Sequence, residues 1–370
     1  MFKKISFKMG VSRVLIAALV LFPLLMGTAS TVAASNAAGA VYTMTNSSAG
    51  NKIQEFDRAA DGKLTVGGSF STDGKGSGTG LGSQGAIVLS KDNHWLFAVN
   101  AGSNEISVFS VQANKLKLVD KASSHGSNPI SLTVSGPWLY VLNAGSGGGI
   151  AGFRVTGNGH LSFMQGSVRL LSNNGGTLSP EEIGFTPDGG NLVVSEKASN
   201  RIDTYAIANG VAHGPMVNTS AGPAPYGFGF TPHGALVISE AANSAASSYK
   251  VGDKGLKVIS ASVADTQAAA CWLVVSADGS LAYAANAASG TLSAYAVSDS
   301  GKLSLLSAVA GNTGAGSHPV DMDFSSHDQF LYALSSGNSM INAFAVNDDG
   351  SLSSIGSFSS PAGAAGLAAR

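Results

Sequence analysis

Short apolar runs, each followed by a polar turn, recur along the chain from about residue 40 to the C-terminus. In one stretch, residues 181–186 (EEIGFT) and 191–195 (NLVVS) flank a Pro-Asp-Gly-Gly turn, and residues 201–207 (RIDTYAI) follow a second loop. The first and second runs of another repeat, AIVLS and WLFAV, are apolar at nearly every position, as in strands covered on both faces. The third run alternates between apolar and polar positions. This order predicts three β-strands joined by turns, followed by a weaker fourth strand.

The strand pattern repeats seven times, and each repeat carries an aromatic residue in its third strand. A period of about 40–50 residues built from short strands is typical of a β-propeller with one four-stranded blade per repeat. We therefore predict an all-β, seven-bladed β-propeller of antiparallel blades. Equivalent aromatics in every blade indicate packing between blades. These residues are Phe56, Phe109, Phe153, Tyr205, Tyr249, Tyr295 and Phe344.

The first repeat lacks a first strand of its own, because it opens directly on the second-strand sequence at residues 41–46. The chain ends in SPAGAAGLAAR, whose place in the repeat matches the first strand of the preceding blade. We expect residues 365–369 to supply the missing strand, which closes the ring and covers two sheet edges. The glycine-rich residues 67–85 lack Gly-Lys-Ser/Thr, so they are predicted to form a flexible connection rather than a phosphate-binding loop.

The N-terminus has the features of a secretory signal peptide. Residues 1–13 are basic, residues 14–26 are apolar apart from Pro23, and small residues follow as far as Ala34. The apolar run is short against the ~20 residues of a membrane span. We predict a leader over 1–35 and a secreted propeller over 36–370, although an uncleaved leader would act as an anchor.

Charge and cysteine content narrow the range of partners. The full chain carries 21 basic and 22 acidic residues, and loss of the leader leaves 17 basic against 22 acidic, a net charge of −5. A mildly acidic surface argues against nucleic acid, or a membrane after leader cleavage, as a partner. The single Cys271 excludes an internal disulfide, and burial is its expected role. We expect a monomer with no cofactor and no metal.

Two sets of residues are expected to meet at one end of the central channel, because the first strand begins where the second strand ends. Carboxylates that lie close together raise one another's pKa, which suits acid–base chemistry. We therefore predict catalytic roles for Glu196 and Glu240, which replace Asn at the ends of second strands in adjacent blades. A solvated acidic rim is the alternative. Asn100, Asn143 and Asn286 are expected to cap turns. The predicted ligand-binding residues are His125, Asn128, Glu181, Glu182, Tyr226, Trp272, Asn286 and His318.

The repeats resemble those of the lactonase-type seven-bladed propellers, which include 6-phosphogluconolactonases and carboxymuconate-cyclising lactonases. FTPDGGNLVVSEKASNRIDTYAI and TQAAACWLVVSADGSLAYAANAASGTLSAYAV carry the resemblance. It implies a catalytic His, Glu and Arg side chains around the channel. The family's Gly-Pro-Arg-His run reads Gly-Pro-Ala-Pro at residues 222–225, and the family's Glu is present as Glu240. The missing cations argue against a phosphorylated or carboxylated lactone, since such a substrate needs cationic partners.

Two functions remain open from the sequence. One is a lactonase-like enzyme that hydrolyses or isomerises a small extracellular lactone, with Glu196 or Glu240 as the acid–base residue. The other is a non-catalytic propeller that binds an extracellular ligand, polymer or protein. A basic group within about 4–6 Å of either glutamate would favour the enzyme.

Overall fold

The computed structural model describes residues 1–6, 10, 37–113, 115–172, 177 and 179–370. The chain divides into two units, Met1–Ser35 and Asn36–Arg370. Most of the predicted leader lies outside the described residues, so the leader stays a prediction. In the part of the chain that is described, no helix is long and apolar enough to cross a membrane.

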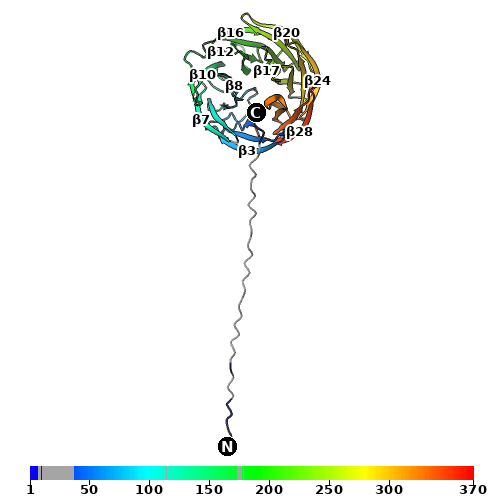
Figure 1. Ribbon diagram of the computed structural model, residues 1–370. Coiled ribbons are helices and arrows are strands. Elements are labelled where there is room, and N and C mark those ends of the chain that lie inside the picture. The colour runs from blue at the N-terminus through cyan, green and yellow to red at the C-terminus, as the bar shows by residue number, and fades with distance from the viewer. Residues whose placement is uncertain (7–9, 11–36, 114, 173–176, 178) are drawn as a thin grey trace. The chain divides into compact units, whose positions relative to one another are not determined.

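The second unit is a ring of seven antiparallel sheets, as predicted (Figure 1). In blade three the fourth strand is divided into β11 and β12. Blades one to three, with strands in order from the channel outward, are β29 (Ala365–Ala369), β1 (Gly39–Met44), β2 (Lys52–Arg58) and β3 (Leu64–Ser71); β4 (Ile87–Leu89), β5 (Trp95–Asn100), β6 (Glu105–Gln112) and β7 (Lys115–Ser123); β8 (Pro129–Ser135), β9 (Trp138–Asn143), β10 (Gly149–Val155), β11 (Leu161–Phe163) and β12 (Arg169–Leu170).

The other four blades each have four strands in sequence order. One short 3₁₀ helix, η1 (Ser326–Asp328), occupies a turn of blade seven. These blades are β13 (Pro180–Phe185), β14 (Asn191–Glu196), β15 (Arg201–Ala208) and β16 (Val211–Thr219); β17 (Pro225–Phe230), β18 (Ala235–Glu240), β19 (Ala245–Gly252) and β20 (Gly255–Ala264); β21 (Ala270–Val275), β22 (Leu281–Asn286), β23 (Thr291–Val297) and β24 (Leu303–Asn312); β25 (Pro319–Phe324), β26 (Phe330–Ser335), β27 (Met340–Val346) and β28 (Leu352–Ser359).

The C-terminal strand closes the ring, as the sequence predicted. β29 pairs antiparallel with β1, from Val41 opposite Ala369 to Met44 opposite Ala365. Leu367 is buried in this strand, and the backbone N–H of Arg370 donates to the carbonyl of Ala40. The first and last parts of the propeller sequence therefore share one blade, and no open sheet edge is left at this junction.

The seven recurring aromatics pack between blades, which confirms their predicted role. All seven are at most 2% exposed. Tyr205, for example, lies in a cluster with residues of blades three and four, and Phe344 lies in one shared by blades six and seven. Buried aromatic side chains of this size dominate core energetics, so they fix the spacing of the blades.

The first strands of neighbouring blades contact one another all the way around the ring and line the central channel. In Figure 1, β8 and β17 lie near the centre, whereas β3, β7, β16, β20, β24 and β28 lie around the outside. The end where first strands begin and second strands finish is called the mouth here. The end that carries the turns between first and second strands is called the opposite end.

Candidate functional site

A segment of the glycine-rich connection covers the channel at the mouth. Residues 80–85, the plug segment, join blade one to the short strand β4. Gln84 makes several of the contacts that hold this segment. Its side-chain amide donates to the backbone carbonyl of Leu273 (2.8 Å) and accepts from the backbone N–H of Leu273 (3.0 Å). The backbone N–H of Gln84 donates to the backbone carbonyl of Glu181. Ser83 donates to the carbonyl of Ile130 at 2.8 Å. The plug segment is therefore tied to several blades, in contrast to the flexible connection that its composition suggested.

Two of the predicted ligand-binding aromatics hold the plug segment. The Tyr226 hydroxyl donates to the Gly82 carbonyl at 2.5 Å, and the Trp272 indole N–H donates to the Ser83 carbonyl at 3.0 Å. Their rings lie 4.9 Å apart, and both side chains are buried. The Tyr226 hydroxyl and the Trp272 indole N–H therefore donate to the plug segment and not into an open ligand site.

A β-bulge recurs near the start of the first strand. In blade four the pairing skips from Pro180 to Glu182, and in blade six it skips from Ala270 to Trp272. Bulges re-aim the side chain of the extra residue and are frequent beside active sites. Here the extra residues are Glu181 and Cys271, both at the mouth. Burial raises the pKa of the Cys271 thiol to about 12, which makes it a poor nucleophile at neutral pH.

Glu181 forms an ion pair at the mouth. Its Oε1 lies 2.7 Å from Nζ of Lys197, and the Ser179 hydroxyl donates to the same oxygen at 2.7 Å. The ammonium also sits 4.9 Å from the centre of the Tyr226 ring. Glu181 is 3% exposed, whereas the Lys197 side chain is 39% exposed. Burial raises the pKa of Glu181, and the charge and hydrogen bond of Lys197 oppose part of that rise.

Two of the asparagines that end second strands bond to the third strand of their own blade. The Asn100 amide donates to Ser107 (2.8 Å), and the Asn286 amide donates to Ser293 (2.8 Å), each seven positions later. Blade seven reverses the pair, with Asn342 donating to Ser335 at 2.8 Å. The Asn143 amide donates to the Ser124 carbonyl. The turn-capping prediction is therefore wrong for Asn100 and Asn286, whose amides bond within the blade, whereas the Asn143 amide bonds to the loop between β7 and β8.

Glu240 follows the same arrangement. The hydroxyls of Ser247 and Ser262 each donate to one of its carboxylate oxygens, and the side chain is fully buried. Gly222 is required beside it, because a Cβ at that position would collide with the carboxylate. Protein atoms therefore surround the Glu240 carboxylate and bond to both of its oxygens.

In blade four, the positions that Glu240 and Ser247 occupy in blade five are both carboxylates, Glu196 and Asp203. Burial and the nearby Asp203 raise the pKa of Glu196 to about 7, and the charge of Arg201, opposite it in the β14–β15 pairing, opposes the rise. Asp203 accepts hydrogen bonds from the Ser172 N–H (2.8 Å) and hydroxyl. Among the residues described, no partner bonds to the Glu196 carboxylate; residues 173–176 and 178 are outside that set.

The remaining predicted residues lie apart. Glu182 points into the channel, where its carboxylate accepts the Phe228 N–H at 2.6 Å and burial raises its pKa well above the usual range. His125 is exposed and stacks on Phe163 with ring centres 3.6 Å apart. Asn128 and His318 are exposed and have positive φ values. The structure thus brings together Glu181, Tyr226 and Trp272, and leaves the other predicted residues outside this group.

The channel itself contains buried acids. Its cavity is about 330 Å³ and includes Glu182, Asp321 and Asp323 in its lining. Asp321 accepts the Leu367 N–H (3.2 Å), Asp323 accepts the Ala369 N–H (2.9 Å), and both therefore anchor the closing strand β29. Burial raises their pKa values to about 8 and about 7, respectively. Within the described residues, no group of three His, Cys, Asp or Glu side chains is arranged to hold a metal ion.

Smaller cavities lie near the mouth. One of about 250 Å³ is lined by the plug segment, Trp272 and Asp321, and another of about 270 Å³ is lined by His125 and Asn143. Sequence reasoning missed Gln84 and Lys197 as mouth residues. Lys197 could have been found, because it directly follows the strand-end Glu196, but Gln84 acts through partners 189 positions away.

Comparison with known proteins gives the same fold. A 6-phosphogluconolactonase proposed for Bacteroides uniformis is 20% identical, with a TM-score of 0.73 over 90% of this chain and 99% of its own. The periplasmic gluconolactonase of Pseudomonas aeruginosa is 18% identical, with a TM-score of 0.69 over 89% of this chain and 99% of its own. At these identities the likeness shows the fold alone. No curated protein matches the sequence of this chain.

The family described as "Lactonase, 7-bladed beta-propeller" matches residues 31–174 and 236–365, which is more than half of the chain. The matched segments leave out residues 175–235, where Glu181, Lys197 and the Gly-Pro-Ala-Pro run are found. These residues of blades four and five therefore lie outside the part of the chain that the family model matches. With its seven-bladed architecture and this match, the chain belongs to the lactonase family of seven-bladed β-propellers.

Proposed function

We propose that this protein hydrolyses a small uncharged lactone at the mouth, outside the cytoplasm, with Glu181 as acid–base residue and Lys197 as electrophilic partner. The observation that carries the proposal is the 2.7 Å contact between Lys197 Nζ and Glu181 Oε1. It supplies the carboxyl and the cation of a lactonase-type site in the segment where the family's Arg and His are missing. Membership of the lactonase family supports the reaction class.

The chemistry needs only water and these two side chains. Glu181 takes a proton from water as the water oxygen attacks the lactone carbonyl carbon. The Lys197 ammonium donates a hydrogen bond to the carbonyl oxygen as negative charge develops on it. The tetrahedral intermediate then breaks its bond to the ring oxygen, which takes the proton back from Glu181. The product is the open-chain hydroxy acid.

Glu181→Gln and Lys197→Met test the proposal on a panel of sugar and alkyl lactones, followed by acid release in a pH-stat. We expect wild type to hydrolyse at least one lactone and Glu181→Gln to lose roughly 10²-fold or more in kcat/KM. Lys197→Met is expected to lose on the order of 10²-fold. Because burial raises the pKa of Glu181 and the base must be ionised, wild-type activity should rise with pH through that raised pKa.

Glu196→Gln and Glu240→Gln are the matched controls, and they also test the earlier prediction for these residues. Full activity in Glu181→Gln, at an unchanged melting temperature, would contradict its assigned role. Loss of activity in Glu196→Gln or Glu240→Gln alone would return the acid–base role to that glutamate. Absence of hydrolysis across the panel would leave ligand binding as the function.

Ligand binding without turnover is the second candidate. It is favoured by the burial of Glu196 and Glu240, which are at most 1% exposed, and by a large cavity at the opposite end of the channel. In either case we propose a secreted monomer that acts on a small extracellular molecule and binds neither nucleic acid nor membrane once the leader is removed. N-terminal sequencing of the exported protein and its mass in solution check these two points.

A further inference from the structure

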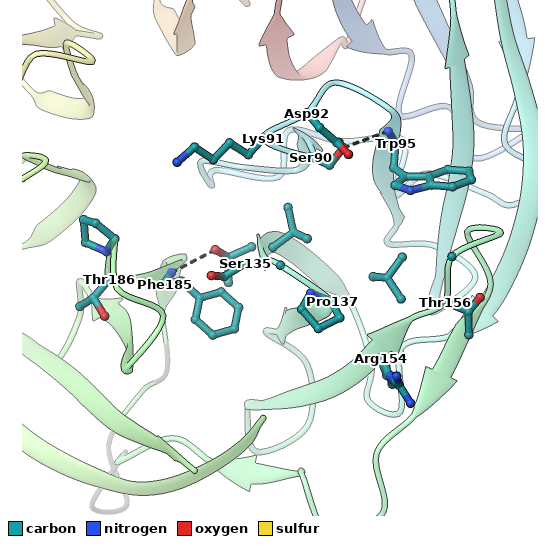
Figure 2. A pocket seen from close by; sticks show the side chains of 16 residues that line it. Ser90, Lys91, Asp92, Trp95, Ser135, Pro137, Arg154, Thr156, Phe185 and Thr186 are labelled. Carbon is teal, nitrogen blue, oxygen red and sulfur yellow. Dashed lines mark hydrogen bonds between the residues drawn. The ribbon is translucent and has the colours of Figure 1, made fainter. Parts of the chain in front are cut away.

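The largest cavity that we describe lies at the opposite end, away from the mouth. It has a volume of about 1000 Å³ and is built from the turns of blades two, three and four (Figure 2). Ligand pockets for small molecules span roughly 300–1000 Å³, so this space admits more than one sugar-sized ring. It shares Thr133, Val134 and Phe185 with the channel cavity.

The cavity exists because blade three has a shortened turn. Only Gly136 and Pro137 join its first and second strands, whereas residues 90–94 in blade two and 186–190 in blade four do so with longer turns. Gly136 has φ 52°, a value that suits glycine in so tight a connection. The two longer turns therefore stand on either side of a depression over blade three.

Two cations line this depression without an ion pair. Lys91 comes from the turn of blade two and Arg154 from the end of β10, and both are exposed. Among the described residues, neither side chain makes a hydrogen bond or a salt bridge, whereas the lining acid Asp92 pairs with His94 (2.8 Å) and accepts a hydrogen bond from Ser90 (2.5 Å). Figure 2 shows Lys91 and Arg154 at separate edges of the hollow. The cavity is therefore suited to a ligand that carries more than one negative charge.

The rest of the lining combines aromatic surface with hydroxyl groups. Trp95 and Phe185 lie on different sides of the hollow in Figure 2. Gly159 packs so closely against the Trp95 ring that a Cβ there would collide with it, so the ring is held in place. Flat aromatic surface suits the apolar faces of pyranose rings. The hydroxyls of Ser90, Thr156 and Thr186 already donate to side chains of their own turns, so among the described residues Thr133 and Ser135 supply the hydroxyl donors of the lining.

We propose that this cavity binds an acidic saccharide, a short chain of pyranose rings that carry carboxylates. The two separated cations match two carboxylates on different rings, Trp95 stacks on a ring, and the hydroxyls of Thr133 and Ser135 meet sugar hydroxyls. A single inorganic anion would use one cation and none of the aromatic surface. This site is separate from the mouth, so binding is independent of lactone hydrolysis.

The test is isothermal titration calorimetry of the propeller with trigalacturonate and with neutral maltotriose, in a low-salt buffer. We expect trigalacturonate to bind and maltotriose to bind at least tenfold more weakly. Lys91→Ala and Arg154→Ala should each weaken trigalacturonate binding by tenfold or more, and the double variant should abolish it. Lys302 is exposed and lies outside the lining, so Lys302→Ala removes one positive charge elsewhere on the surface. This control variant should bind trigalacturonate like wild type.

Several outcomes would overturn the proposal. These are equal binding of maltotriose, equal weakening by Lys302→Ala, or displacement of trigalacturonate by equimolar inorganic phosphate. Failure of trigalacturonate to bind wild type at all overturns it as well. The double variant should keep wild-type lactone hydrolysis, so failure of this site and failure of the mouth assignment can be told apart.

Discussion

At the mouth of the channel, residues 80–85 cross the opening and hydrogen-bond to several blades, whereas the opposite end is hollowed by a cavity of about 1000 Å³. The mouth has a buried carboxyl already paired with its cation, Glu181 with Lys197. At the opposite end, Lys91 and Arg154 form no ion pair with any residue that the structure describes. One end thus pairs its carboxyl with a cation inside the protein, and the other presents two exposed cations to solvent.

The difference has a simple origin in the repeat. At the mouth, the residues that end the second strands change while every second strand keeps six residues, so a substituted side chain remains inside the blade, as Glu240 does between Ser247 and Ser262. At the opposite end, a turn length changes, and the loss of residues leaves space. In a propeller, a change of loop length is therefore a better indicator of a cavity than a change of residue type.

The two ends of the channel keep their different shapes only while the ring of blades is closed. Removal of residues 361–370, which include β29, opens that ring. The deletion exposes the edge of β1 and leaves the channel acids Asp321 and Asp323 without the N–H groups of β29. We expect the melting temperature to fall by on the order of 10 °C or more, as measured by calorimetry. An unchanged midpoint would mean that β29 does not hold the ring.

The sequence was sufficient for the architecture because local patterns determine it. The aromatic of each third strand and the strand-like end of the chain predicted the seven blades and the closure by β29. The sequence was insufficient for the sites. Gln84 acts on Leu273, far away in the chain, and no local pattern marks such a contact. The cavity beside Gly136 and Pro137 arises because this turn is shorter than the turns of the neighbouring blades. The residues that line it come from three blades, so no single stretch of sequence marks it.

Gln84→Ala tests the closed end directly. It leaves the buried N–H and carbonyl of Leu273 without their partner, which is expected to cost about 2–3 kcal/mol of unfolding free energy. Hydrogen exchange of residues 80–85 should accelerate, while exchange around residues 133–137 should stay unchanged. The control is Gln112→Ala, an exposed glutamine in β6. Equal stability of the two variants would show that the plug segment is not held by Gln84.

Asp321→Asn tests the acids between the two ends, with the smallest expected effect. Burial raises the pKa of Asp321 to about 8 from its ordinary value of 3.8, so the folded state holds the proton more tightly than the unfolded state. The contribution of Asp321 to the wild-type free energy of unfolding is therefore fully present below about pH 4, and it is lost as the pH rises toward about 8. Asn does not titrate, so the variant should gain melting temperature relative to wild type across this range.

The pH trend, rather than the absolute stability, is the readout, because Asn accepts fewer hydrogen bonds than the carboxylate of Asp321. Asp349→Asn, at an exposed acid, is the control and should follow the wild-type trend. Parallel melting curves for Asp321→Asn and wild type from pH 4 to about pH 9 would contradict a raised pKa at this site.

The central claim is that the open, cationic end of the channel is where an acidic saccharide binds. Hydrogen exchange with mass spectrometry, with and without trigalacturonate, tests it most directly. The account predicts slower exchange at residues 88–95, 133–138 and 154–157, which surround the cavity, and no change at residues 179–197 of the mouth. Protection confined to residues 179–197 would contradict it, and so would a lack of protection at a saturating concentration.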